Sequence, residues 1–121
     1  MALGSALGGM GRYACSGLGV RWFGESFPWG TLFVNVAGSL VIGVLAVALP
    51  ADGRFLADNS RVFLMVGVCG GFTTFSSFSM ETLNLARNGD WGAASAYTLG
   101  SVVLCLAAVA IGYFGALALA R

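Results

Sequence analysis

The feature that most constrains this chain is the length of its apolar stretches. Four of them, each about as long as the roughly 20 residues that a helix needs to cross a bilayer, occupy most of the sequence. The connections are short, and Trp22, Trp29 and Trp91 fall at stretch ends, where aromatic side chains gather at membrane surfaces. The sequence therefore predicts an all-α membrane protein with one domain over residues 1–121, whose four transmembrane helices span about 2–20, 30–49, 62–85 and 91–120.

Charge is scarce, and its scarcity excludes several classes of function. The chain has six basic and five acidic residues, so its net charge is +1, and no basic run offers a surface for nucleic acid. Histidine is absent, which excludes imidazole metal sites and histidine acid–base catalysis. Cys15, Cys69 and Cys105 each lie inside an apolar stretch and are interpreted as small buried side chains rather than disulfides or metal ligands. We therefore expect no enzyme.

The arginines give the chain almost no preferred orientation in a membrane. With four spans, Arg54, Arg61 and Arg121 fall on one side and Arg21 and Arg87 on the other. Because an excess of positive charge fixes orientation, this near balance predicts insertion in both directions, although weak charges could still set one orientation. Four short helices barely enclose a pathway, so a homodimer is expected, and mixed orientations permit an antiparallel one.

The third apolar stretch contains a segment that favours unwinding, "GGFTTFSSF" from Gly70 to Phe78. Arg61 and Arg87 bracket the stretch, so its centre at residue 74 falls near the bilayer midplane. Glycine costs about 1 kcal/mol in a helix relative to alanine, and unpaired carbonyls in lipid cost several kcal/mol each. In an antiparallel dimer the two breaks would meet, and four carbonyl oxygens could surround one Na⁺. The alternative is an ordinary helix with a glycine-rich contact face.

Two stripes of side chains follow the helical period through this segment. Phe72, Phe75 and Phe78 recur every third residue, and the hydroxyls of Thr74 and Ser77 lie beside them. A phenyl ring has a positive edge that a dry anion can approach, and hydroxyls donate hydrogen bonds to anions. The alternative is that the rings face lipid and the hydroxyls bond back to their own helix.

The other three stretches carry deep polar side chains that are mainly hydrogen-bond donors. No carboxylate lies deep in these stretches, and Glu81 lies near the end of the third. A route lined by donors favours an anion over a cation or a proton-coupled substrate. The alternatives are hydrogen bonds between helices and an arginine that extends to the membrane surface. These donors are Arg12, Thr31, Asn35, Tyr97 and Ser101.

Three segments together resemble one family of membrane proteins. "GGFTTFSSFSMET", "GTLFVNVAGSLVIG" and "GSALGGMGRY" resemble the signatures of the Fluc fluoride channels, also called CrcB-type proteins, and the likeness covers nearly the whole chain. The resemblance implies an antiparallel, dual-topology homodimer whose third helix is broken at the midplane around a structural Na⁺. It implies passive export of fluoride from the cytoplasm across a bacterial inner membrane, which lowers fluoride toxicity.

The resemblance also assigns residues to the two ions. The carbonyls of Gly70 and Thr73 would hold the Na⁺. The family often has threonine at Ser77 and leucine at Phe72, and Cys105 leaves an extension of the polar track in doubt. The implied fluoride pathway consists of Arg12, Thr31, Asn35, Phe75, Ser77, Phe78, Glu81, Tyr97 and Ser101.

Two other functions suit a chain of this size. Small multidrug transporters also have four spans and insert both ways, but they need a membrane-embedded carboxylate in the first span, and this chain has none there. A non-conducting assembly subunit would use its 19 glycines for helix packing alone. Fluoride conduction distinguishes the channel from both.

Overall fold

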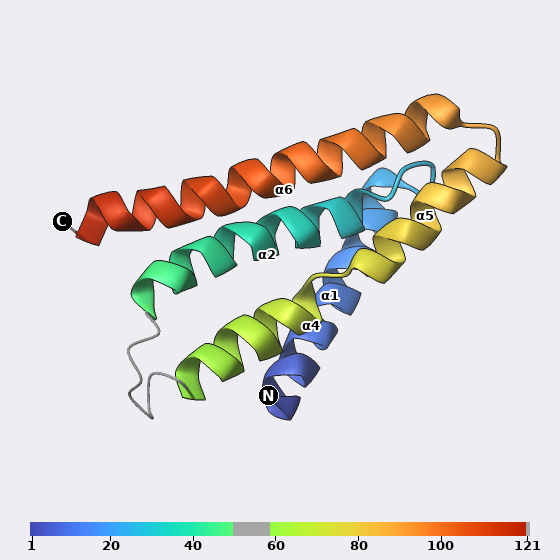
Figure 1. Ribbon diagram of the computed structural model, residues 1–121. Coiled ribbons are helices and arrows are strands. Elements are labelled where there is room, and N and C mark those ends of the chain that lie inside the picture. Colours follow the sequence, from blue (N-terminus) through green and yellow to red (C-terminus); the bar gives the residue numbers. More distant parts are fainter. Residues whose placement is uncertain (50–58, 121) are drawn as a thin grey trace.

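A computed structural model describes residues 1–49 and 59–120, which form helices joined by short connections (Figure 1). The third apolar stretch is divided among three consecutive helical elements, the first of which is π-helical. The elements are α1 (Ala2–Phe23), α2 (Trp29–Ala48), η1 (Val62–Cys69), α4 (Gly70–Phe72), α5 (Phe75–Arg87) and α6 (Trp91–Ala120).

Within the described ranges, three helical stretches are long and apolar enough to cross a membrane. They are Trp29–Ala48, Asn59–Arg87 and Trp91–Ala120. The all-helical membrane protein expected from the sequence is therefore confirmed. The first helix, α1, has 22 residues but is not among the three, and its role as a fourth span stays a prediction. Arg54 and Arg121, on which the predicted charge balance partly rests, lie outside the described residues.

Helix α2 lies at the centre of the arrangement and runs beside α6 (Figure 1). Gly43 of α2 and Gly112 of α6 make this contact close. A Cβ on Gly112 would collide with the carbonyl oxygen of Leu40, and one on Gly43 would lie 2.9 Å from the backbone nitrogen of Tyr113. Because lipid provides no hydrophobic drive between helices, such small residues supply tight van der Waals contact instead.

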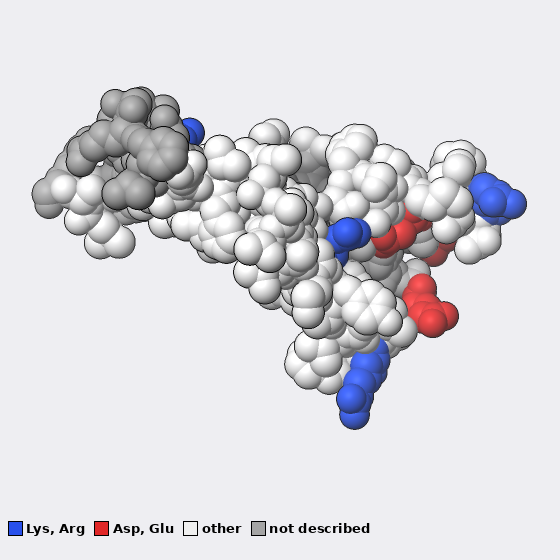
Figure 2. All heavy atoms as spheres, turned by 90° about the horizontal axis from the view of Figure 1, so that it is seen from below, with Lys and Arg blue, Asp and Glu red and all other residues white. Residues whose placement is uncertain are grey.

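The chain buries few large side chains of its own. Only Val34 and Tyr97 are fully buried among the larger described residues, and Phe75 and Leu119 are 79% and 89% exposed. In Figure 2 most of the coloured side chains gather toward one end of the visible face, a further basic side chain lies next to the grey atoms, and most of the surface between them is white. An apolar surface this extensive suits hydrocarbon or a second chain rather than water.

The helical path of the third stretch stops at Phe72 and resumes at Phe75. Thr73 and Thr74 are both extended, with φ, ψ of −85°, 159° and −153°, 120°. Two extended residues take the backbone out of the i→i−4 hydrogen-bonding pattern, so their polar groups need other partners. We call Thr73–Thr74 the interruption.

A matched pair of alanine substitutions tests the α2–α6 contact. Gly112→Ala should lower the thermal unfolding temperature of the purified protein, because the added methyl group meets the Leu40 carbonyl. Gly115→Ala is the control, since a Cβ there meets nothing within 4 Å. Both changes gain about 1 kcal/mol of helix propensity, so the difference between them reports packing. Equal unfolding temperatures for the two variants would contradict this account of the contact.

Candidate functional site

Asn35 joins α2 to the interruption by two hydrogen bonds. Its Nδ2 donates to the carbonyl of Thr74 at 3.0 Å, and the backbone N–H of Thr74 donates to its Oδ1 at 2.7 Å. In a continuous helix, other peptide groups would pair with the N–H and the carbonyl of Thr74. Here the side-chain amide of Asn35 pairs with both. The predicted pore asparagine is therefore held against the backbone of the third stretch, and its second N–H remains available.

Two threonines cap the helix ends on either side of the interruption. The Cys69 carbonyl accepts from the Thr73 backbone N–H at 3.0 Å and from the Thr73 hydroxyl at 2.9 Å. Thr74 is the N-cap of α5, and its hydroxyl oxygen accepts from the Ser77 backbone N–H at 3.1 Å. The sequence prediction for Thr74, a member of a hydroxyl stripe and of the segment expected to unwind, did not include this capping role. A threonine directly before a helical Phe-Ser-Ser segment is a recognisable helix-start signal.

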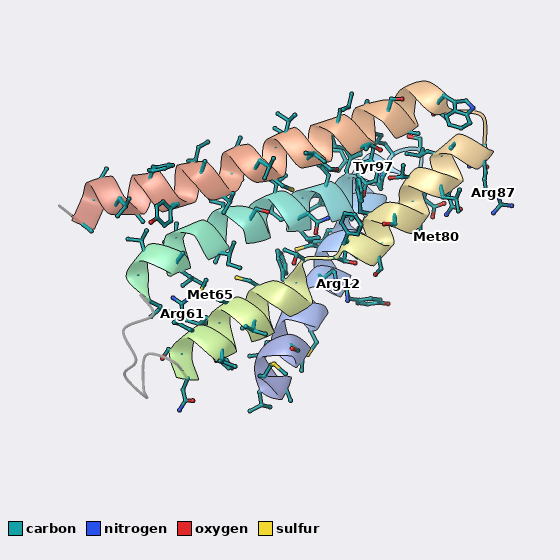
Figure 3. All side chains as sticks on the ribbon, in the orientation of Figure 1. Arg12, Arg61, Met65, Met80, Arg87 and Tyr97 are labelled. Carbon is teal, nitrogen blue, oxygen red and sulfur yellow. The ribbon has the colours of Figure 1, made fainter. Side chains whose placement is uncertain are left out.

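Arg12 of α1 also reaches the interruption. Its Nε donates to the Gly71 carbonyl at 3.2 Å, and the side chain is partly buried. Figure 3 shows Arg12 at the level where α4 ends. Arg12 is not among the residues that line the two cavities described below, and its predicted place in an ion pathway stays a prediction.

A cavity of about 400 Å³ opens beside the interruption, and we call it the interruption cavity. Ser101 of α6 is 6% exposed there, and its hydroxyl has no hydrogen-bond partner among the described residues. Phe75 and Phe78 form one wall, with their ring centroids 5.4 Å apart. The structure thus brings together seven predicted or newly found site residues around this space. They are Asn35, Gly70, Thr73, Thr74, Phe75, Phe78 and Ser101.

A second, larger cavity of about 710 Å³ contains carboxylates, and we call it the carboxylate cavity. Its lining includes Glu81, Glu25 and Asp90, together with the predicted pathway residues Thr31 and Ser77. The Thr31 hydroxyl donates to Glu81 Oε1 at 2.7 Å. Three carboxylates at this position oppose an anion unless cations or donors offset them, so the two cavities differ in electrostatic character.

Tyr97 lines neither cavity but contacts one lining residue of each. It is fully buried, and its ring lies 5.1 Å from that of Phe78 in the interruption cavity. Its hydroxyl donates to Glu81 Oε2 at 3.5 Å, in the carboxylate cavity. Both Tyr97 and Thr31 were expected to donate to an anion, whereas here they donate to Glu81. Spacing along single helices could not reveal this pairing, because the three groups come from three different helices.

The interruption cavity contains groups suited to two different ions. Among its described lining residues there is no Asp, Glu, Lys or Arg. The Ser101 hydroxyl, the second Asn35 N–H and the phenyl edges can replace part of the water around a small anion. Carbonyl oxygens at the same interruption suit a hard cation such as Na⁺. The cavity is therefore lined by residues that offer both hydrogen-bond donors and carbonyl acceptors.

Comparison with known proteins gives a consistent result. Residues 1–113 match a family described as CrcB-like protein, Camphor Resistance (CrcB). A relative from Opitutus terrae is 56% identical over 120 residues, which cover 98% of this chain and 91% of the relative. Relatives from Paramagnetospirillum magneticum and Rhodospirillum rubrum are 53% and 52% identical, each over 117 residues that cover 96% of this chain and 91% of the relative. All three are named fluoride-specific ion channel FluC.

The hydrogen bond between Thr31 and Glu81 leads to a stability prediction. Thr31→Val keeps the side-chain shape but deprives the carboxylate of a donor, so it should cost about 1–3 kcal/mol of unfolding free energy. Thr82→Val is the control, because the Thr82 hydroxyl donates only to the Phe78 carbonyl of its own helix. Denaturant unfolding in detergent measures both. If Thr31→Val is no more destabilising than Thr82→Val, the contact between helices contributes nothing.

Proposed function

The chain belongs to the CrcB-like family, and on that premise we propose that it is a fluoride-selective passive channel. The observation that carries the proposal is the match over residues 1–113, together with near full-length relatives that are named fluoride-specific ion channels. Membership of a channel family also makes the chain a transport protein and not an enzyme.

We propose that fluoride passes through the interruption cavity and loses water there in stages. Fluoride is small and holds its hydration shell tightly, so a pathway must replace that shell with other donors. The unpartnered Ser101 hydroxyl and the free Asn35 N–H supply hydrogen bonds, and the ring edges of Phe75 and Phe78 supply weaker positive potential. Selectivity over chloride then follows from a route sized for the smaller ion. The proposed pathway also extends toward the carboxylate cavity and the interruption. This part of it consists of Arg12, Thr31, Ser77, Glu81 and Tyr97.

The proposed assembly is an antiparallel homodimer of dual-topology chains, in which the two interruptions meet at the bilayer midplane. The exposed position of Phe75 supports a partner at this face, because the residue is 79% exposed within one chain. Gly70 and Thr73 line the interruption cavity, and no described residue donates a hydrogen bond to the carbonyl of either one. They fit a Na⁺ site in which each chain gives two oxygens, and a bound Na⁺ would supply positive charge that holds the junction together.

The cellular role that follows is fluoride export across a bacterial inner membrane. A passive channel lets the anion leave down its electrochemical gradient, so a cytoplasm that is negative inside keeps its fluoride concentration low. Export of this kind lowers fluoride toxicity.

A liposome efflux assay tests the function directly. Liposomes that contain the protein are loaded with KF or KCl, valinomycin is added to release potassium, and halide efflux is recorded. We expect rapid fluoride release and no chloride release above protein-free liposomes. Proton flux that depends on a cationic drug, without fluoride release, would instead indicate a small multidrug transporter. The absence of both fluoride release and drug-dependent proton flux would indicate a non-conducting assembly subunit.

Substituting a phenyl ring of the pathway tests the proposed mechanism. Phe75→Ile should preserve the fold and reduce fluoride efflux by at least about tenfold, because loss of about 1.4 kcal/mol of ion stabilisation changes a rate that much. Phe33→Ile is the control, because Phe33 on α2 is also exposed but lines neither the interruption cavity nor the carboxylate cavity. Efflux through Phe75→Ile at the wild-type rate would remove the ring edges from the mechanism.

A further inference from the structure

The interruption leaves several carbonyl oxygens without partners in a helix, and only some of them accept another hydrogen bond. The Cys69 carbonyl is satisfied locally by Thr73. The carbonyls of Gly71 and Thr74 each accept a hydrogen bond from a side chain distant in the sequence. The carbonyls of Gly70 and Thr73 receive no hydrogen bond from any described residue. Between Gly70 and Thr74, the Gly71 and Thr74 carbonyls are therefore bonded, whereas the Gly70, Phe72 and Thr73 carbonyls accept from no described residue.

Two of the three free carbonyls belong to residues of the interruption cavity. Gly70 and Thr73 line this cavity, and Gly70 is exposed in the single chain, whereas Gly71 and Phe72 do not line it. Gly71 packs against α1 instead, because a Cβ placed on it would lie 2.6 Å from the Ser5 carbonyl oxygen. The Arg12 bond therefore satisfies the carbonyl of a residue that lies outside this cavity lining.

Close packing of α1 brings Arg12 to this position. Gly8, one helical turn before Arg12, is buried against the third stretch, and a Cβ on it would collide with the Val68 carbonyl and lie 2.8 Å from the Phe72 nitrogen. The glycine face of α1 thus lets the guanidinium reach the C-terminal end of α4. A cation at a helix C-terminus is favoured by the exposed carbonyls there, more so away from water.

From this pattern we propose that Arg12 is a positioning residue of the cation site. Arg12 holds the Gly71 carbonyl against α1, and Asn35 holds the Thr74 carbonyl. Together they fix the backbone so that the carbonyls of Gly70 and Thr73 converge on a monovalent cation. The inference rests on the proposed sodium site and deepens it. Arg12 acts on the cation through the backbone and does not touch it.

Sodium-dependent unfolding temperature tests this role separately from conduction. The purified dimer is heated in N-methylglucamine chloride with increasing NaCl at constant ionic strength, and tryptophan fluorescence follows unfolding. Wild type should be stabilised by Na⁺. Arg12→Met should need at least about tenfold more Na⁺ for half of the stabilisation, as expected for loss of a hydrogen bond from a charged group. Arg12→Lys should fall between them, because lysine keeps the charge but not the planar fork.

Arg21→Met is the matched control, since Arg21 is an exposed arginine of the same helix. It should keep the wild-type Na⁺ dependence. If Arg12→Met does not fold, Arg12→Gln is measured in the same way.

Two results would overturn the proposal, and they can be told apart. If wild type responds to Na⁺ and Arg12→Met responds at the same concentrations, however low its unfolding temperature, then Arg12 only stabilises the fold. If wild type itself does not respond to Na⁺, the sodium site of the proposed function fails, and the role of Arg12 fails with it. Fluoride efflux remains a separate measurement in either case.

Discussion

The rest of this structure depends on how the backbone polar groups of two extended residues are satisfied inside an apolar chain. In hydrocarbon an unpaired peptide group costs several kcal/mol, so a helix that stops in the middle of a span needs partners at once. Asn35 pairs with both backbone groups of Thr74, and the hydroxyls of Thr73 and Thr74 pair with the Cys69 carbonyl and the Ser77 N–H. Arg12 donates to the Gly71 carbonyl, two residues before Thr73. Every polar contact at the interruption therefore comes from α1, α2 or the third stretch itself, and the packing of these helices fixes the site.

Small residues make that packing close enough. Gly8 lets α1 approach the third stretch, and Gly43 and Gly112 let α2 and α6 meet almost backbone to backbone. The large apolar side chains are left on the outside, where lipid or a second copy would cover them. Close packing at these glycines thus supports both stability and site geometry, although only two large side chains of residues 1–49 and 59–120 are completely buried.

Much of the fold could be predicted from the sequence, because long apolar stretches permit little besides helices in a membrane. The helix over residues 91–120 followed from composition. Glycine propensity favoured unwinding in "GGFTT", with an ordinary helix as the alternative, but Gly70 and Gly71 are helical and the extended residues are Thr73 and Thr74. The partners across helices did not follow. Glu81 accepts from both Thr31 and Tyr97, and Arg12 donates to the Gly71 carbonyl. These pairs form between side chains of different helices, so the residue spacing within one helix cannot predict them. The cap at Thr74 could have been predicted from its position before α5.

We propose that the free carbonyls of Gly70 and Thr73 meet a cation at the junction of two inverted copies. An experimental structure of the protein in lipid, at a resolution that reveals bound ions, would show this cation. We expect a single ion on the two-fold axis, surrounded by the carbonyl oxygens of Gly70 and Thr73 from both chains, with Arg12 on Gly71 and Asn35 on Thr74. A third helix that continues unbroken through Thr73 and Thr74, or two copies that lie parallel, would contradict it.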